Sequence, residues 1–197
     1  MAKATNKDTI TTPSAESLAE AARKVSGKGL PPVHLWNPAF SGDIDMRIAR
    51  DGTWFYEGTP ITRPKLVHLF STILRKEDDS YYLVTPVEKV GITVEDAPFV
   101  AVDFDAAGHG VDQVLVFETN VCDKVLARKD NPIRVVRNDV TGEPSPYVLV
   151  RSNLEALIDR KSFYRLVDIG IHRDGWFGLW SDGAFFEIIR SDEMMVD

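Results

Sequence analysis

Two regions of this chain share one predicted order of elements, strand–strand–helix–strand, and such an internal duplication restricts the fold to two similar units. In the first region, apolar residues alternate with others around Met46 and Ile48. Asp51-Gly52 is typical of a hairpin turn, because glycine accepts a positive φ. Apolar residues then recur with helical spacing. The predicted elements are strands at 46–49 and 54–56, a helix at 66–74 and a strand at 81–84.

The second region repeats this order between residues 134 and 167. A strand is predicted at 134–139, a short helix at 152–160 and a strand at 163–167. A competing alignment matches 168–177 to 45–55; it is closer locally, although no helix follows it. Either alignment predicts that the chain uses one hairpin unit twice.

The composition indicates a folded globular protein, since 44% of the 197 residues are hydrophobic and 27% are charged. The net charge of −7 argues against nucleic acid as a partner, because neutralising phosphates needs a basic face. A small anion remains compatible with this charge, since a pocket needs only a few well-placed arginines. Cys122 is the only cysteine, which excludes an intramolecular disulfide and a zinc site made of several thiolates.

The hydrophobic segments are too short for a membrane span, which needs about 18 consecutive apolar residues. The start of the sequence lacks the apolar core of a signal peptide. We therefore expect a cytoplasmic protein without a membrane span. Residues 1–28 are predicted to form a polar tail over 1–12, followed by a helix.

The sequence contains no recognisable catalytic or metal site. No serine occupies a nucleophile elbow, and the calcium-like loop that begins at Asp103 lacks ligands at its fifth and twelfth positions. We predict no catalytic residue and no metal ligand. The catalytic alternative is an enzyme that combines carboxylates with His109 or His172 in one cleft. The four histidines are His34, His68, His109 and His172.

Arginines recur at matching places in the two regions and are the main binding candidates. Arg47 and Arg134 lie on predicted strands, whereas Arg63 and Arg151 precede the predicted helices. One interpretation pairs them with acidic residues across a sheet. The other brings arginines of both units together around an anionic ligand at the domain interface. Stacking and polar contacts would then come from Trp36, Asn37, Glu88 and Asn120.

Several short motifs of the chain are distinctive. They include Trp36-Asn37-Pro38, GDIDMRI at 42–48, YEGTPI at 56–61, YLVTPVEKV at 82–90 and DAPF at 96–99. Together they resemble the bacterial family catalogued only as domain of unknown function 1285, over nearly all of the chain after about residue 30. The resemblance implies a domain duplication whose C-terminal half is superficially similar to pleckstrin-homology folds. It also implies a nucleotide-like ligand between the domains and a role in signal transduction, both of which are suggestions for the family, and it brings no catalytic residues.

We therefore predict an α+β fold with a duplicated β-β-α-β core. A smaller N-terminal domain is expected at 29–94, and a larger, strand-rich C-terminal half-barrel of pleckstrin-like character at 95–197. Trp54, Phe55, Trp176 and Trp180 are expected to contribute to an apolar seam between the domains.

The predicted function is a non-enzymatic module that binds a nucleotide-like or other small anionic ligand between the two domains. The alternatives are a scaffold for a protein partner and an enzyme with an unrecognised carboxylate and histidine site. No cofactor is identified.

Overall fold

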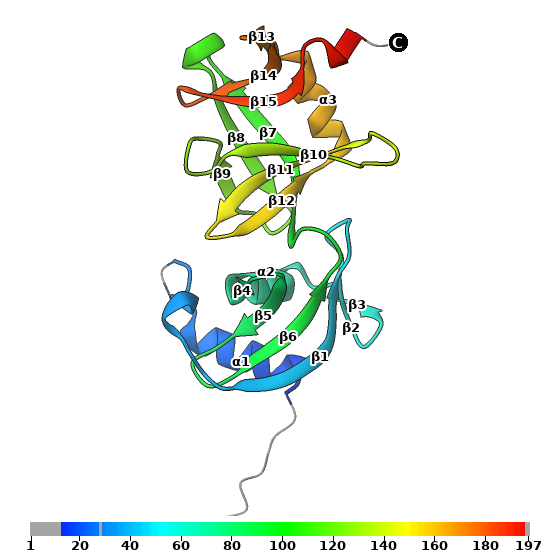
Figure 1. Ribbon diagram of the computed structural model, residues 1–197. Helices are drawn as coiled ribbons and strands as arrows, with labels where there is room; N and C mark the ends of the chain where they lie inside the picture. Colours follow the sequence, from blue (N-terminus) through cyan, green and yellow to red (C-terminus); the bar gives the residue numbers. More distant parts are fainter. Residues whose placement is uncertain (1–12, 28, 196–197) are drawn as a thin grey trace, which may run out of the picture.

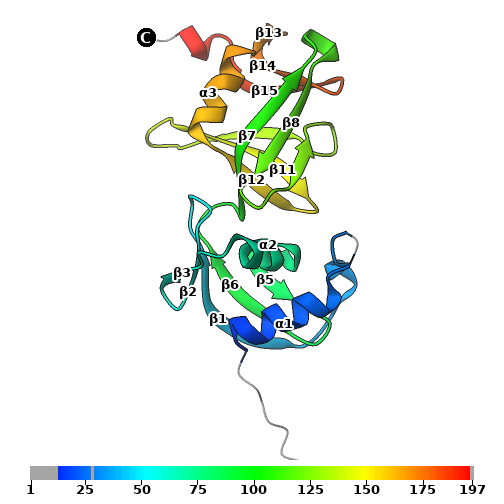
Figure 2. The same ribbon diagram turned by 180° about the vertical axis from the view of Figure 1, so that it is seen from behind.

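Two lobes, stacked one on the other, make up the computed structural model, which describes residues 13–27 and 29–195 (Figures 1 and 2). The N-terminal lobe contains two helices and one sheet, and the C-terminal lobe contains one helix and two sheets. The polar tail expected at 1–12 lies outside the described residues. None of the described helices is long and apolar enough to cross a membrane.

Helix α1 (Ala15–Val25) starts where Ser14 caps it. The backbone N–H of Ser17 donates to the Ser14 hydroxyl at 3.2 Å, and the N–H of Ser14 donates to the Ser17 hydroxyl at 3.1 Å. This reciprocal pair satisfies two of the N–H groups that a helix start leaves open. Leu18 and Ala22 on its apolar side are fully buried, and α1 packs against helix α2 (Pro64–Thr72).

The sheet of the N-terminal domain is strongly curled and curves around α2 (Figure 1). Its strands are β1 (Phe40–Ile48), β2 (Trp54–Tyr56), β3 (Thr59–Pro60), β4 (Leu74–Glu77), β5 (Ser80–Val84) and β6 (Lys89–Val94). Their order is β3-β2-β1-β6-β5-β4, in which β1 and β6 run parallel and the other neighbours run antiparallel. The predicted strand–strand–helix–strand order is confirmed by β1, β2, α2 and β5. A 3-10 turn, η1 (Val33–Leu35), precedes the sheet.

The core of this domain lies between the sheet and α2. Trp54 of β2 stacks on Phe70 of α2 with ring centroids 6.2 Å apart, and both side chains are buried. Met46 and Ile48, which the alternating pattern assigned to one face of a strand, are buried in the same cluster. The period of two in β1 and the helical period in α2 thus direct apolar side chains to one common interior.

The C-terminal domain is a strand-rich half-barrel, as predicted. Its main sheet has the order β10-β11-β12-β7-β8-β9, and a second sheet has the order β13-β14-β15. The strands are β7 (Phe99–Ala107), β8 (Val114–Thr119), β9 (Lys124–Leu126), β10 (Ile133–Arg137), β11 (Pro144–Arg151), β12 (Leu154–Ile158), β13 (Ile171–Arg173), β14 (Trp176–Ser181) and β15 (Ala184–Arg190). Helix α3 (Arg160–Asp168) packs against β7, and the short turns η2 (Gly110–Asp112) and η3 (Glu193–Met195) complete the domain.

The two main sheets have the same topology, which accounts for the duplication. In each, two three-stranded meanders are joined through a central parallel pair, β1 with β6 and β7 with β12. Strand β1 therefore corresponds to β7, and β4 corresponds to β10. Neither sequence alignment matched these pairs: the first set β10 against β1, and the second set the β13–β14 hairpin against β1 and β2. The copies also differ in where they place a helix, since α2 lies within the first copy and α3 follows the second.

The predicted helix at 152–160 and the predicted strand at 163–167 are wrong. Residues 154–158 form β12, in which the apolar side chains of Leu154, Ala156 and Ile158 are buried with a period of two. The helix comes one element later, because the Asp159 side chain accepts a hydrogen bond from the N–H of Ser162 at 2.7 Å and so starts α3. The short apolar run was compatible with both periods, and pairing with β7 and β11 selects the strand.

The apolar seam expected from four aromatic residues is also wrong. Trp176 and Trp180 lie on β14, at the end of the C-terminal domain that faces away from the N-terminal domain (Figure 1). Trp54 stacks inside the N-terminal domain instead. The buried apolar residues of both domains form one continuous cluster, and hydrogen bonds and ion pairs also connect the domains.

Candidate functional site

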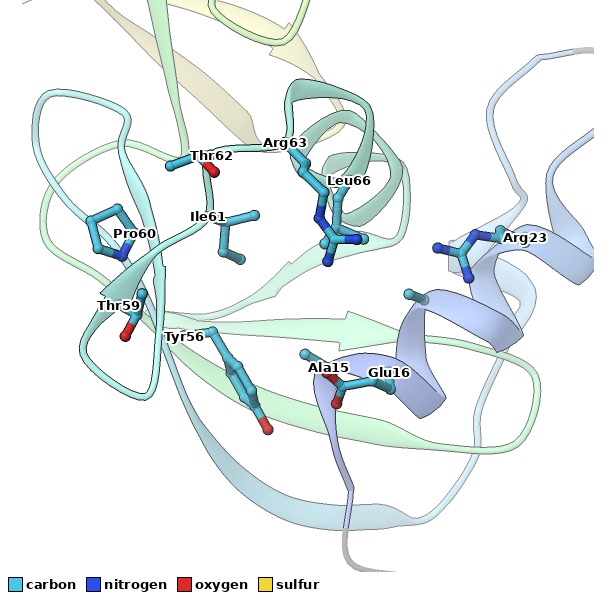
Figure 3. A pocket seen from close by; sticks show the side chains of 11 residues that line it. Ala15, Glu16, Arg23, Tyr56, Thr59, Pro60, Ile61, Thr62, Arg63 and Leu66 are labelled. Atoms are coloured by element: carbon cyan, nitrogen blue, oxygen red, sulfur yellow. The ribbon is translucent and has the colours of Figure 1, made fainter.

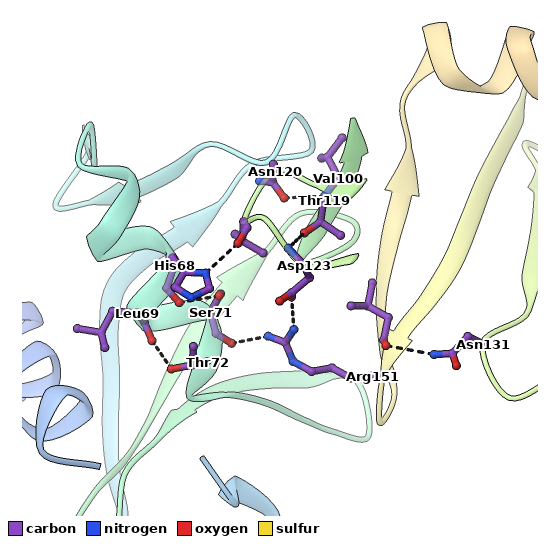
Figure 4. Close-up of polar contacts among 12 residues, drawn as sticks. His68, Leu69, Ser71, Thr72, Val100, Thr119, Asn120, Asp123, Asn131 and Arg151 are labelled. Carbon is purple, nitrogen blue, oxygen red and sulfur yellow. Dashed lines mark hydrogen bonds and ion pairs between the residues drawn. The ribbon is translucent and has the colours of Figure 1, made fainter. Parts of the chain in front are cut away.

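The turn at 119–123, between β8 and β9, forms the centre of the junction between the two domains (Figure 4). The backbone N–H of Asn120 donates to the carbonyl of Val100 at 2.8 Å, and its side-chain oxygen accepts from the N–H of Val100 at 3.0 Å. Its side-chain amide donates to the carbonyl of Gly52 in the N-terminal domain at 3.2 Å. Asn120, one of the predicted binding residues, therefore joins the domains through its side chain.

Arg151 is the predicted arginine that lies at this junction (Figure 4). It forms an ion pair with Asp123, and it donates to the carbonyl of Ser71, at the end of α2, at 2.8 Å. Its guanidinium lies 4.7 Å from the centroid of the Phe99 ring. Close by, Nδ1 of His68 lies 2.8 Å from the carbonyl oxygen of Val121. These contacts hold α2 against the turn at 119–123.

A second group of polar contacts connects the domains around Arg50, at the end of the β1–β2 hairpin. The Arg50 guanidinium lies 2.7 Å from an oxygen of Asp96 and donates to the hydroxyl of Ser145 at 3.0 Å. The hydroxyl of Tyr147 donates to the other oxygen of Asp96 at 2.7 Å. Burial, followed by this hydrogen bond to Asp96, raises the pKa of Tyr147. The phenol therefore stays neutral and acts as a donor in this contact.

Arg47 and Arg134 each pair with a glutamate rather than meeting each other. Arg47 forms an ion pair with Glu95, and its guanidinium lies 4.2 Å from the centroid of the Phe55 ring. Arg134 donates through two nitrogens to Glu155, at 2.6 Å each, and this hydrogen bonding raises the pKa of Arg134. For these two arginines the structure shows the pairing with acidic residues that was the first interpretation.

A pocket of about 440 Å³ lies between the domains. The N-terminal domain contributes Leu30 to His34 and residues at the end of α2 and the start of β4, and the C-terminal domain contributes the turn between β11 and β12. Its ionisable lining residues are His34, Arg75, Lys76 and Arg151, and among the described lining residues there is no aspartate or glutamate. In a chain with a net charge of −7, this lining is locally cationic. We call it the interdomain pocket.

The cationic residues of the interdomain pocket differ in how they are paired. Arg75 is tied to the protein, because it donates to the carbonyls of Val33 at 3.0 Å and Trp36 at 2.7 Å and forms an ion pair with Glu77. Its buried Nε atom has no hydrogen-bond partner among the described residues. The Lys76 ammonium lies 5.2 Å from the centroid of the Tyr81 ring, and no described carboxylate forms a salt bridge with it. Lys76 can therefore give its full charge to a ligand.

The remaining predicted binding residues lie apart from the interdomain pocket. Trp36 is half-buried and supports Arg75 through its carbonyl, and Asn37 is exposed beside it. Arg63 lines a separate pocket within the N-terminal domain (Figure 3). Glu88 lies in the turn between β5 and β6, beside α1. The structure thus brings Arg151 to the interdomain pocket and Asn120 to the domain junction, whereas the other six predicted residues are dispersed or play supporting roles.

Glu88 offers a test that depends on pH, because partial burial raises the pKa of its carboxyl group. A carboxyl whose pKa is raised in the folded protein favours folding below its unfolded pKa and loses that contribution as the pH rises through the folded value. We expect Glu88→Gln to raise the Tm at about pH 7. At about pH 4 it should change the Tm little, because the Glu88 carboxyl is then mostly neutral in both the folded and the unfolded protein. Glu57→Gln, at an exposed turn, is the control. Equal Tm changes for Glu88→Gln at both pH values would contradict this expectation.

The histidines do not converge on a common cleft with carboxylates. His172 lies on exposed β13 and its Nδ1 atom is 2.8 Å from the hydroxyl of Ser191, and His109 is exposed at the start of η2. Within residues 13–27 and 29–195, no three His, Cys, Asp or Glu side chains are close enough to hold a metal ion. Cys122 is exposed and has a positive φ of 65° in the junction turn.

The residues of the interdomain pocket that sequence reasoning missed include Arg75, Lys76 and Asn153. Arg75 and Lys76 directly follow the segment predicted as a helix at 66–74, but they belong to β4, which begins at Leu74. Asn153 lines the interdomain pocket, and its side chain donates to the carbonyl of Lys76 at 3.2 Å. It lay within the segment predicted as a helix, so its place in a turn facing β4 was not visible from the pattern.

Comparison with known proteins places the two domains in one family. The model described as "Domain of unknown function (DUF1285), N-terminal domain" matches residues 31–97, and that described as "Protein of unknown function (DUF1285), C-terminal domain" matches 98–188. A DUF1285 family protein from Silicibacter pomeroyi DSS-3, solved at 2.50 Å, is 63% identical, with 91% of this chain and 98% of that chain covered and a TM-score of 0.85. One from Shewanella baltica OS155, solved at 1.40 Å, is 32% identical, with coverages of 62% and 90% and a TM-score of 0.49. No curated protein matches the sequence.

Proposed function

We propose that this chain, which belongs to the DUF1285 family, is a cytoplasmic binding protein that takes a small anionic molecule into the interdomain pocket. The observation that carries the proposal is the lining of this pocket, which combines Arg75, Lys76 and Arg151 with no described carboxylate. Its volume of about 440 Å³ is in the range of pockets that hold small molecules. More narrowly, we propose that this anionic molecule is nucleotide-like and that its binding has a role in signalling.

The rest of the lining determines what kind of anion the pocket would accept. Leu30, Pro31, Pro32, Leu74 and Leu154 form the apolar wall of the pocket. A molecule with a flat or aliphatic body and one charged end would bury its body against this wall and direct its oxyanion to Lys76. A nucleoside monophosphate has this division into a stacking base and a charged phosphate, whereas a bare inorganic ion would leave the apolar wall in water.

The position of the pocket gives binding a structural consequence. Its walls come from both domains, and Arg151 already connects them, because it pairs with Asp123 of its own domain and donates to the carbonyl of Ser71 in the other. A ligand that contacts Lys76 on one side and the turn at 152–154 on the other would stabilise one arrangement of the two domains. A signalling role requires such coupling between ligand binding and domain arrangement. A ligand shifts the equilibrium between two domain arrangements only by the difference between its affinities for them.

A thermal-shift screen with AMP, GMP, ADP and inorganic phosphate tests the proposal. A ligand present at 100 times its Kd adds about 2.7 kcal/mol to the stability of the folded state, and the Tm should rise accordingly. We expect Lys76→Met to weaken binding at least about tenfold, because one charge-assisted hydrogen bond contributes about 1.5–3 kcal/mol. Isothermal titration of both proteins measures this loss.

Lys129→Met is the matched control, since Lys129 is exposed in a turn of the C-terminal domain and does not line the interdomain pocket. It should bind like the unmodified protein. If Lys76→Met binds as tightly as the control, the pocket is not the site. If no compound in the screen raises the Tm, the scaffold alternative gains weight and the search turns to protein partners.

A further inference from the structure

A second pocket, of about 330 Å³, lies wholly within the N-terminal domain (Figure 3). Helix α1 forms one wall, the β2–β3 hairpin a second, and the segment at 61–66, which enters α2, a third. We call it the α1 pocket. None of its lining residues lines the interdomain pocket, so it is a separate site.

Two arginines from different elements reach into the α1 pocket. Figure 3 shows the guanidinium of Arg63, at the start of α2, and that of Arg23, on the last turn of α1, directed toward the space between the two helices. No described carboxylate forms a salt bridge with either arginine. Most other arginines of the chain are paired, as Arg47, Arg134 and Arg151 illustrate.

The acidic residues near the α1 pocket do not compensate both charges. Glu20 of α1 is engaged by Lys24, with 2.8 Å between the charged atoms. Glu16 lines the pocket at its edge and is the single described carboxylate there. The pocket therefore keeps a net positive charge, because two guanidinium groups face one carboxylate.

The remaining lining suits a small organic body. Ala15, Ala19, Ile61 and Leu66 supply apolar surface, and Tyr56 and Thr59 add polar groups. A guanidinium group binds a carboxylate or phosphate through two parallel hydrogen bonds. A lysine ammonium acts as a point charge and lacks this geometric match to an oxyanion. The volume is near the lower end for small-molecule pockets.

We propose that the α1 pocket binds a small organic oxyanion, a carboxylate- or phosphate-bearing metabolite, clamped between Arg23 and Arg63. Such a ligand bridges α1 and α2. Helix α1 lies before residue 31, where the match to the N-terminal family model begins, so four of the eleven lining residues come from a segment outside that model. Binding at the α1 pocket thus holds α1 against the part of the domain that the family model matches, independently of any ligand at the interdomain pocket.

The test is a titration of the ¹⁵N-labelled full chain with citrate and, separately, with inorganic phosphate, followed by NMR. We expect saturable shifts of the amide signals of Ala19 to Arg23 and of Arg63 to Leu66, with little change around residues 151–154. Shifts with citrate alone assign the site to carboxylates, shifts with phosphate alone assign it to phosphate groups, and shifts with both support a general oxyanion site. If these signals do not move with either compound, the proposal is wrong.

Arginine variants decide whether the two guanidinium groups carry the binding. Arg23→Met and Arg63→Met each keep an extended side chain, and both positions are exposed, so the fold should be retained. Each is expected to raise the Kd for the bound compound at least tenfold, whereas Lys65→Met, an exposed change on α2 outside the pocket lining, should leave it unchanged. Equal affinity in all three variants would overturn the assignment to Arg23 and Arg63. Lys76→Met should bind normally here, which separates this site from the interdomain pocket.

Discussion

Replacing Phe99 with alanine is expected to lower the free energy of unfolding by about 3–5 kcal/mol, as is typical when a buried aromatic ring is removed and leaves a cavity. Phe99 begins β7, and its side chain is fully buried. Its ring also lies under the guanidinium of Arg151, which connects the two domains. The loss should therefore combine missing apolar burial with a less rigid domain junction. Urea unfolding followed by far-UV circular dichroism measures it.

Phe40→Ala is the matched control, because the same ring is removed from a position where 54% of the residue is exposed. We expect its cost to be below about 1 kcal/mol, since little apolar surface is buried there. If Phe99→Ala destabilises no more than Phe40→Ala, the ring is not part of a close-packed core. If the unfolding of Phe99→Ala splits into two transitions, the ring also couples the domains.

Replacing Gly52 with alanine is expected to cost about 2–4 kcal/mol, because two unfavourable effects meet at this residue. Its φ of +84° is in the left-handed region, where a residue with a Cβ atom is strained. A Cβ atom would also lie 2.5 Å from the side-chain nitrogen of Asn120 and 3.0 Å from a methyl carbon of Val100. The change would therefore disturb the hydrogen bond from Asn120 to the Gly52 carbonyl. Thermal and urea unfolding measure the total loss.

Gly58→Ala separates the two effects at Gly52. Gly58 has a φ of +72°, but a Cβ atom there would meet nothing within 4 Å. It should cost only the backbone strain, about 1–2 kcal/mol. The difference between the two variants then reports the crowding at the domain junction, and adding Asn120→Ala to Gly52→Ala should recover part of it. Equal losses at Gly52 and Gly58 would show that the junction tolerates the extra atom.

Both predictions concern the domain junction, and the proposed ligand site depends on the same contacts. Asn120 and Arg151 were predicted as ligand contacts, whereas in the structure their polar atoms are used mainly within the protein. Their contribution to a site in the interdomain pocket is to hold its walls. Lys76 is the cation there that has no described carboxylate partner, and we therefore expect it to have the largest effect on binding.

The sequence by itself determined the class of the fold and four elements of the first domain, β1, β2, α2 and β5. The alternation around Met46 and Ile48 and the helical spacing at 66–74 were sufficient, because a period of two and a helical period place apolar residues on different faces. A duplication was expected as well, but the repeat is in the topology of the two main sheets, whereas the predicted helix at 152–160 and strand at 163–167 are wrong. The equivalent strands could not be identified from the sequence, since β7 and β12 become neighbours only through parallel pairing between residues 57 positions apart, such as Phe99 and Ala156.

Tertiary structure alone decided which side chains meet. Residues 154–158 had an apolar pattern short enough for a helix or a strand, and the neighbours β7 and β11 made it a strand. Arg47 and Arg134 pair with the nearby Glu95 and Glu155, whereas Arg23 and Arg63, forty positions apart in the sequence, face one pocket. Ion pairing and pocket formation depend on distances of a few ångströms between residues remote in the chain. The local spacing of residue types carries no information about those distances. For this reason the sequence predicted elements of the first domain, whereas the structure corrected those of the second and located the candidate sites.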